Sequence, residues 1–425
     1  MIGSPEYEAP AAAGASPLSA DAAARLARGR AERRVLSVGL ALIGFFVAAS
    51  ALTAVLGGAI SWTTLHLALV GAATVGIGTF MPHFAVTLAG TEPEPARGRL
   101  AVLGMLAVSA VSVTAGVGGG SSWLVVLGAG GVLAGAAGTG WMTFAPLRRG
   151  LGRRHPIVQL TYMVALLELA VGVCLALLLY LGWPPVVSRW PELKLAHAWL
   201  TLLGFVSLTV AGTLVYLFPT VVGARIVAHR SLVALVVGCV AGPIVVAVAG
   251  ALGSGALAAA GAWLTVVGAL GQAWYVAGTF RRRGRWAYDH GWHRVVIGHL
   301  AAGAGWFVLA AVSLAAGLSS TARVDGWSLG AGAVPLLGGW VVQELIGSWS
   351  HLLPAVGPGD VATHARQRAR LGRWPLSRLV ALNVGVGAAW AGLALETPLL
   401  VAIGGALVMG SLAVGLVLFG RSLRA

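Results

Sequence analysis

The chain alternates between long apolar stretches and short polar segments rich in arginine. Twelve stretches are long enough to cross a bilayer as an α-helix, which needs roughly 20 predominantly apolar residues. They lack the polar face that a soluble amphipathic helix carries. The pattern predicts an all-α, polytopic integral membrane protein with about twelve transmembrane helices, at residues 35–57, 62–89, 99–117, 122–146, 157–182, 194–220, 231–253, 255–280, 294–317, 327–354, 375–395 and 397–420.

Composition supports this interpretation. Hydrophobic residues make up 58% of the 425 residues and charged residues only 10%, whereas soluble domains have about 25% charged residues. Because the connecting segments are short, we expect one transmembrane helical domain over residues 35–425. Residues 1–34 are rich in alanine, proline and serine and then in arginine. We expect them to form a disordered basic cytoplasmic tail and not a cleaved signal peptide.

The net charge of +15 reflects membrane topology. If the N-terminus is cytoplasmic, 25 of the 28 Lys and Arg residues fall on the cytoplasmic side, and the exceptions are Arg189, Lys194 and Arg323. This asymmetry follows the positive-inside rule and predicts a plasma-membrane protein with both termini in the cytoplasm. The partner that the charge indicates is the lipid bilayer, with its anionic surface, and not nucleic acid.

Several predicted helices end in similar sequences near the cytoplasmic side. These endings are GTFMPH (78–83), MTFAP (142–146), GTLVYLFPTVVG (212–223) and GSWSHLLPAVG (347–357). One interpretation is an ancient duplication of helix pairs. The other is that proline and glycine end helices at an interface, whatever the history of the chain.

Five of the ten histidines lie in or at the predicted transmembrane helices. His66 and His197 are near the outer ends of the second and sixth helices, and His83, His299 and His351 are in the inner parts of the second, ninth and tenth. A histidine in hydrocarbon usually has a partner, and imidazole is a common ligand of haem iron and of copper. We therefore expect at least two of the five to be cofactor ligands, on two levels. For each one singly, the alternative is a hydrogen-bonded packing residue.

The other histidines and most tryptophans have simpler interpretations. Five histidines lie in arginine-rich cytoplasmic segments, where a solvated or headgroup-facing ring is expected: His155, His229, His290, His293 and His364. Six tryptophans cluster at the outer helix ends and predict an aromatic belt at the membrane interface: Trp62, Trp123, Trp183, Trp190, Trp199 and Trp327.

Two carboxylates are predicted to be buried in the membrane, Glu168 in the fifth helix and Glu344 in the tenth. An ionisable group at this depth is a functional candidate, and we expect both to handle protons. Glu344 and His351 are seven residues apart and share one helix face, as a proton path or a quinol site would require. The alternative is a neutral glutamic acid that is hydrogen-bonded to a neighbouring helix.

Other chemistry has little support in the sequence. Cys174 and Cys239 both lie inside helices, and there is no CxxCH motif, which excludes c-type haem attachment. There is also no GxGxxG, P-loop, HExxH or GxSxG motif, so nucleotide, zinc-protease and serine-hydrolase chemistry are not expected.

The segment LAHAWLTLLGFVSLTVAGTLVYLFPTVVGARI (195–226) resembles the histidine-bearing helices of NnrS-type membrane proteins, which contain haem and copper and are linked to nitrogen-oxide stress. Residues 66–90 and 336–356 add to the likeness. The helix count and the outer histidines of the second and sixth helices are also similar to haem–copper oxidase subunit I. The membrane regions of actinobacterial copper oxidases look alike too. The resemblance implies b-type haem, copper as a further cofactor, and His66 and His197 as ligands. It also implies quinol and an extracytoplasmic cupredoxin or cytochrome as partners.

The chain departs from the oxidase pattern in three places. Thr201 stands where that class has a tyrosine, the helix at 231–253 has no histidine, and the tenth helix has only His351. A complete oxygen-reducing haem–copper centre is therefore not expected. Only His66 and His197 match the family, and His83, His299 and His351 rest on their depth alone.

The sequence favours one function and leaves two others open. The first is a membrane oxidoreductase or electron-transport protein that binds haem, with or without copper, and acts with quinol or in nitrogen-oxide metabolism. The second is a cofactor-free proton-coupled transporter or channel that uses Glu168 and Glu344. The third is a structural membrane subunit.

Overall fold

The computed structural model describes residues 20–57, 61–226, 230–285, 290–320, 329–355 and 360–424, all mainly helical and without a strand in these ranges. The chain is an all-α polytopic membrane protein. Within the described residues, eleven helices are long and apolar enough to cross a membrane. The tenth predicted helix, 327–354, is not among them: its continuous helix, 333–352, is as long as Pro375–Ala394, which qualifies, but it contains the polar residues Gln343, Glu344 and His351.

The first helix begins earlier in the chain than predicted. Residues 20–34, which we expected to be disordered, form the first turns of the first helix, because alanine, arginine and glutamate favour the helix. The rest of that predicted tail, residues 1–19, lies outside the described residues.

The elements in the first half of the chain are, in order, α1 (Ala20–Gly57), α2 (Trp62–His66), η1 (Leu67–Ala73), α3 (Thr74–Ala89), α4 (Ala96–Gly118), α5 (Ser122–Leu147), η2 (Gly150–Arg154), α6 (Pro156–Tyr180), α7 (Pro184–Val187), α8 (Trp190–Ala198), η3 (Trp199–Ser207) and α9 (Leu208–Val222).

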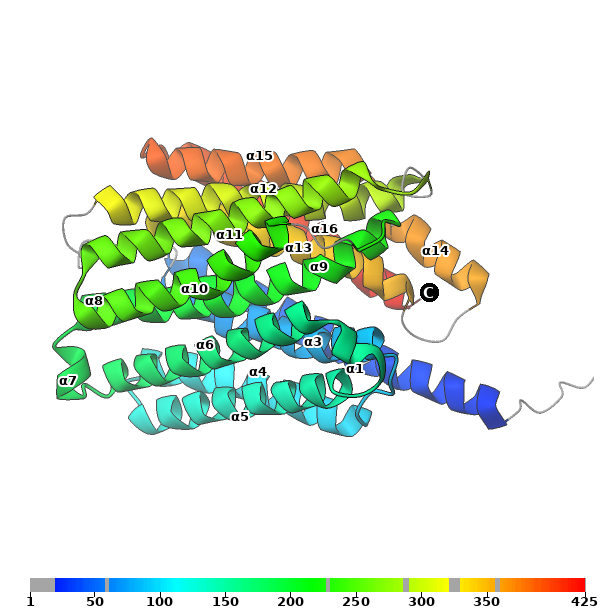
Figure 1. Cartoon of the computed structure of the whole chain (residues 1–425), viewed down its shortest axis with the longest axis horizontal. Coiled ribbons are helices and arrows are strands. Elements are labelled where there is room, and N and C mark those ends of the chain that lie inside the picture. Colours follow the sequence, from blue (N-terminus) through cyan, green and yellow to red (C-terminus); the bar gives the residue numbers. More distant parts are fainter. Residues whose placement is uncertain are drawn as a thin grey trace, which may run out of the picture.

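The second half continues the antiparallel bundle. Figure 1 shows the start of α1, the helix α14 and the C-terminal end of the chain at one end of the bundle, with α7 at the opposite end. The elements are α10 (Arg230–Leu252), α11 (Gly255–Arg281), α12 (His290–Ser320), η6 (Gly330–Gly332), η7 (Pro335–Val341), α13 (Val342–Leu352), η8 (Leu353–Ala355), α14 (Val361–Leu371), α15 (Pro375–Ala394) and α16 (Pro398–Leu423).

Three of the predicted transmembrane helices contain a π-helical segment in their first half. The segments are η1, η3 and η7, and they fall in the second, sixth and tenth predicted helices. A π turn closes its hydrogen bond over five residues instead of four, and such turns are frequent at functional sites. The recurrence at every fourth helix favours a four-helix unit over a helix pair as the repeat.

The observed helix Trp190–Val222, which corresponds to the sixth predicted helix at 194–220, forms the centre of the bundle. Of its most apolar window, 83% is buried, against 17% for Pro398–Leu423 in α16. The outer helices expose large apolar side chains, such as Leu127 (62%) and Trp141 (68%). A surface of this kind is compatible with lipid and not with water.

The predicted aromatic belt is present in part. Trp62, Trp123, Trp183 and Trp190 are each more than 40% exposed, as an interfacial tryptophan should be. Trp199 differs, because it is only 1% exposed and packs in the central core cluster. Trp327 lies outside the described residues.

Candidate functional site

The two outer histidines lie side by side. His66 is the last residue of α2, directly before η1, and His197 lies in the last turn of α8, two residues before η3. Their ring centroids are 6.4 Å apart and the ring planes differ by 1°. Because the second and sixth helices are far apart in the sequence, this parallel pair is a product of the tertiary fold.

Backbone carbonyls fix the orientation of both rings. Nδ1 of His66 lies 2.8 Å from the carbonyl oxygen of Trp62, and Nδ1 of His197 lies 2.8 Å from that of Gly172. A carbonyl oxygen only accepts, so each Nδ1 carries the proton and each Nε2 keeps a lone pair. Neither Nε2 has a hydrogen-bond partner among the described residues. A metal-ligating histidine is held in this way by its other nitrogen.

Each ring therefore has its Nε2 available to a metal ion, and the two rings lie close together, with their centroids 6.4 Å apart. Both rings are half-buried, and Trp62 stacks on His66 with the ring centroids 3.8 Å apart. Trp62 therefore supports one face of the His66 ring, and both histidine rings remain partly exposed.

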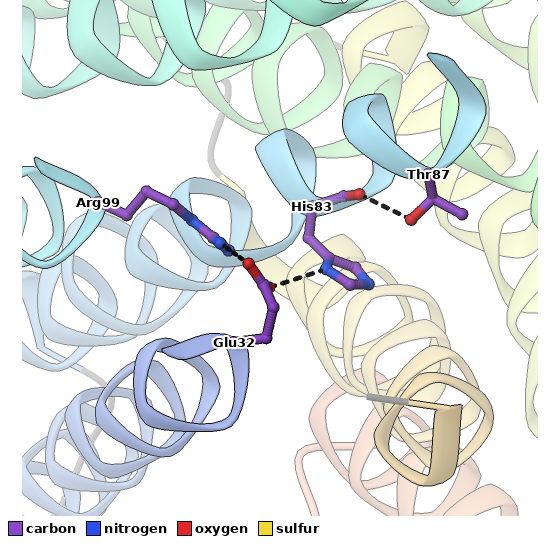
Figure 2. A network of polar contacts seen from close by, with 4 residues as sticks. All are labelled: Glu32, His83, Thr87 and Arg99. Atoms are coloured by element: carbon purple, nitrogen blue, oxygen red, sulfur yellow. Dashed lines mark hydrogen bonds and ion pairs between the residues drawn. The ribbon is translucent and has the colours of Figure 1, made fainter. Parts of the chain in front are cut away.

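At the other end of the same bundle, His83 belongs to a charged cluster. Figure 2 shows Glu32 of α1 between His83 of α3 and Arg99 of α4. Nδ1 of His83 is 3.4 Å from a Glu32 oxygen, and Arg99 donates to the other oxygen. The side chains of Glu32 and His83 are 17% and 15% exposed, and that of Arg99 only 5%. The cluster ties three helices together and gives His83 a partner other than a metal.

His299 is part of a buried amide network. Its Nδ1 lies 2.9 Å from Oε1 of Gln343, and Nε2 of Gln343 donates to Oδ1 of Asn383 at 3.0 Å. Trp306 Nε1 donates to the same oxygen at 2.7 Å. Because an amide oxygen accepts, Nδ1 of His299 carries its proton. Its Nε2 is buried and has no hydrogen-bond partner among the described residues.

His351 has a third, separate environment. Its ring stacks on Trp292 with the centroids 5.5 Å apart and the planes 15° apart. Trp292 in turn donates to the carbonyl oxygen of Ser350 at 2.6 Å. Within the described part of the chain, no recorded contact joins His83, His299 and His351. Across all the residues that the structure describes, no group of three or more His, Cys, Asp or Glu side chains is arranged to hold a metal ion.

The two membrane carboxylates are buried as predicted. Glu168 is 3% exposed and Glu344 is 2% exposed, and no carboxyl oxygen of either has a hydrogen-bond partner in the described structure. Each fills the space left by a glycine on a neighbouring helix, because a Cβ added to Gly204 or Gly303 would collide with the carboxyl group. Gly204 lies within η3, so Glu168 packs directly against a π turn.

Four polar residues of these sites were not predicted from the sequence: Glu32, Arg99, Gln343 and Asn383. Glu32 was assigned to the tail, although the helix-favouring composition around it was a usable signal. Gln343 and Asn383 are uncharged amides, and nothing in their spacing marks them as partners of His299. The sites they complete are visible only in three dimensions.

Comparisons with known proteins do not assign the chain to a family. No protein-family model matches the sequence, and no curated protein matches it significantly. The function must therefore be argued from the geometry of the site.

Proposed function

We propose that this chain is a membrane haem-binding redox protein in which His66 and His197 would hold one b-type haem. The observation that carries the proposal is the parallel ring pair, 6.4 Å apart, with both Nδ1 atoms bound to backbone carbonyls. That arrangement presents two Nε2 lone pairs, which is the ligand set of a six-coordinate haem iron.

The number of ligands favours haem over copper alone. The porphyrin supplies four nitrogen ligands itself, so two histidines complete the coordination of its iron. Protein zinc sites use three or four protein ligands, and copper sites with imidazole ligands use a similar number. Among the described residues no third His, Cys, Asp or Glu joins the pair. Copper, if bound, is a further cofactor and not the occupant of this pair.

The remaining assignments follow the resemblance to NnrS-type proteins and haem–copper oxidases. We place both termini in the cytoplasm of a plasma-membrane protein, with the histidine pair near the outer face. Glu168 and Glu344 would move protons, and His83, His299 and His351 stay candidate inner ligands. The family resemblance implies quinol as electron donor and an extracytoplasmic cupredoxin or cytochrome as acceptor. When bound, the haem would supply one-electron chemistry.

The test is an optical spectrum of the purified protein. Protein from haem-replete cells should show a low-spin haem spectrum in reduced-minus-oxidised difference measurements, with about one iron per chain. His66→Ala and His197→Ala should each convert it to a high-spin form, and the double variant should lose the haem. His155→Ala, a half-buried loop histidine, is the matched control and should keep the wild-type spectrum. A low-spin spectrum that survives the double substitution would refute the assignment.

A second candidate is a cofactor-free proton-coupled transporter. The observation that favours it is the pair of buried carboxyl groups with no hydrogen-bond partner in the described structure, one of them packed against a π turn. A colourless, iron-free protein would support this candidate. In that case Glu168→Gln and Glu344→Gln should each abolish proton movement into vesicles that contain the reconstituted protein, and His155→Ala should not.

A further inference from the structure

Four arginines surround an open cleft at the end of the bundle where α14 and the end of α16 meet. The cleft has a volume of about 330 Å³ and is lined by Arg370, Arg373, Arg421, Arg424 and the buried Leu418. This volume is at the lower end of the range of small-molecule sites. All four arginines are exposed.

The cleft is built on a rigid base. Nε2 of Gln367 in α14, which is 1% exposed, donates to the carbonyl oxygen of Ser422 in α16 at 3.2 Å. Arg370 donates to the carbonyl oxygen of Arg421 at 2.9 Å. These bonds hold the last turn of α14 against the last turn of α16, so the guanidinium groups are kept together despite their mutual repulsion.

No carboxylate of the described residues is recorded in an ion pair with these arginines. The ion pairs recorded there are Arg28–Glu92, His83–Glu32 and Arg99–Glu32. Guanidinium groups bind phosphate oxygens through paired hydrogen bonds. A phosphate-bearing anion would suit these donors.

The surroundings point to a lipid as the source of that phosphate. Leu418 forms part of the cleft wall, and exposed apolar side chains lie near the cleft residues in the sequence: Val417 is 52% exposed, Val414 37%, and Leu376, three residues after Arg373, 71%. A phosphate next to an apolar helix face is the arrangement of a phospholipid headgroup and its acyl chains. Basic pockets between transmembrane helices bind such headgroups.

We propose that the cleft between α14 and α16 is a binding site for the headgroup of an anionic phospholipid, and that a headgroup with two phosphates is preferred. A doubly charged headgroup matches four arginines better than a single phosphate does. The site is distinct from the histidine pair, which lies at the other end of the bundle.

The experiment compares lipid binding by two variants with equal loss of charge. Arg373→Gln with Arg424→Gln removes half of the cleft charge and leaves the Arg370 hydrogen bond in place. Arg282→Gln with Arg285→Gln removes the same charge from the end of α11 and the segment after it. Cardiolipin binding is measured in phosphatidylcholine nanodiscs by retention of lipid in native mass spectrometry. We expect about tenfold weaker binding in the first variant and wild-type binding in the second.

Two results would overturn the proposal. Equal weakening in both variants would show that the lipid responds to general surface charge. A thermal stabilisation by inorganic phosphate as large as that by cardiolipin would show that the cleft takes a free anion. If the glutamine variant does not fold, Arg373→Lys with Arg424→Lys replaces it, and weaker binding at unchanged charge is expected because lysine lacks the paired donors.

Discussion

The substitution Gly268→Ala tests how closely α10 and α11 must approach each other. A Cβ added at this position would lie 2.6 Å from the backbone nitrogen of Cys239 and 2.8 Å from the carbonyl carbon of Gly238. Both atoms are backbone atoms of α10 and cannot rotate away. Small residues allow such close helix packing in membranes, where packing replaces the hydrophobic effect as the force between helices. We predict that Gly268→Ala separates the two helices locally.

The magnitude follows from the distances. An ordinary carbon contact is about 3.5–4.0 Å, so the helices must move apart by roughly 1 Å at this point. Overpacking of this kind costs about 1–3 kcal/mol. Removing a helical glycine returns roughly 0.5–1 kcal/mol, so a net destabilisation of about 1 kcal/mol is expected. With an unfolding entropy of about 2.1 cal/mol/K per residue, this corresponds to a fall of roughly 1 °C in Tm for a chain of 425 residues.

Gly278 provides a matched control on the same helix. A Cβ there would meet no atom within 4 Å, so Gly278→Ala should leave the Tm unchanged or raise it slightly. The assay is thermal unfolding of the wild type and both variants in one detergent, followed by circular dichroism at a single heating rate. A Gly268→Ala protein as stable as Gly278→Ala would refute the reasoning that the close approach of the two backbones requires glycine.

Two further predictions concern buried polar groups. Gly204→Ala should destabilise the protein by about 1–3 kcal/mol, because the added Cβ would lie 2.7 Å from Cδ of Glu168. Adding Glu168→Ala should restore most of the Tm, and a purely additive double variant would contradict the contact. Tyr275→Phe should cost about 1–3 kcal/mol, because its hydroxyl donates to the carbonyl oxygen of Val215 at 2.7 Å in the core. A denaturant titration with an unchanged midpoint would contradict this.

The sequence was sufficient to predict the helical membrane fold and the depth of the key side chains. A run of apolar residues sets the length of a helix, and counting along it places His66 and His197 on one level. The parallel orientation of their rings was not predictable, since it depends on the carbonyl of Gly172, which belongs to another helix. The positions of Glu168 and Glu344 within apolar runs also predicted their burial. They did not predict the glycines that pack against them, Gly204 and Gly303.

The errors have physical causes. The start of α1 was placed late because hydropathy detects the membrane crossing, whereas helix propensity extends the helix into the arginine-rich residues before it. Glu32 was therefore missed as the partner of His83 and Arg99. The π segments were not predicted, because the composition of a helix does not indicate where its hydrogen bonds change from spanning four residues to spanning five. Trp199 was expected at the interface, but it faces the core from within one such segment.

The wide turns of η1, η3 and η7 also have a consequence for how this chain changes over generations. A π turn holds one residue more than an α turn, so each of these segments behaves as a tolerated one-residue insertion inside a membrane crossing. A one-residue deletion within η3 is absorbed when the wide turn closes to an α turn, whereas a deletion in an α-helical part of the same crossing turns the remainder by about 100° around its axis. Tyr216 and Phe218, now in the core, would then face other neighbours. The three π segments are therefore the places in these crossings where a one-residue length change is best tolerated, and a codon lost from the α-helical parts of the same crossings is the mutation that selection should remove first.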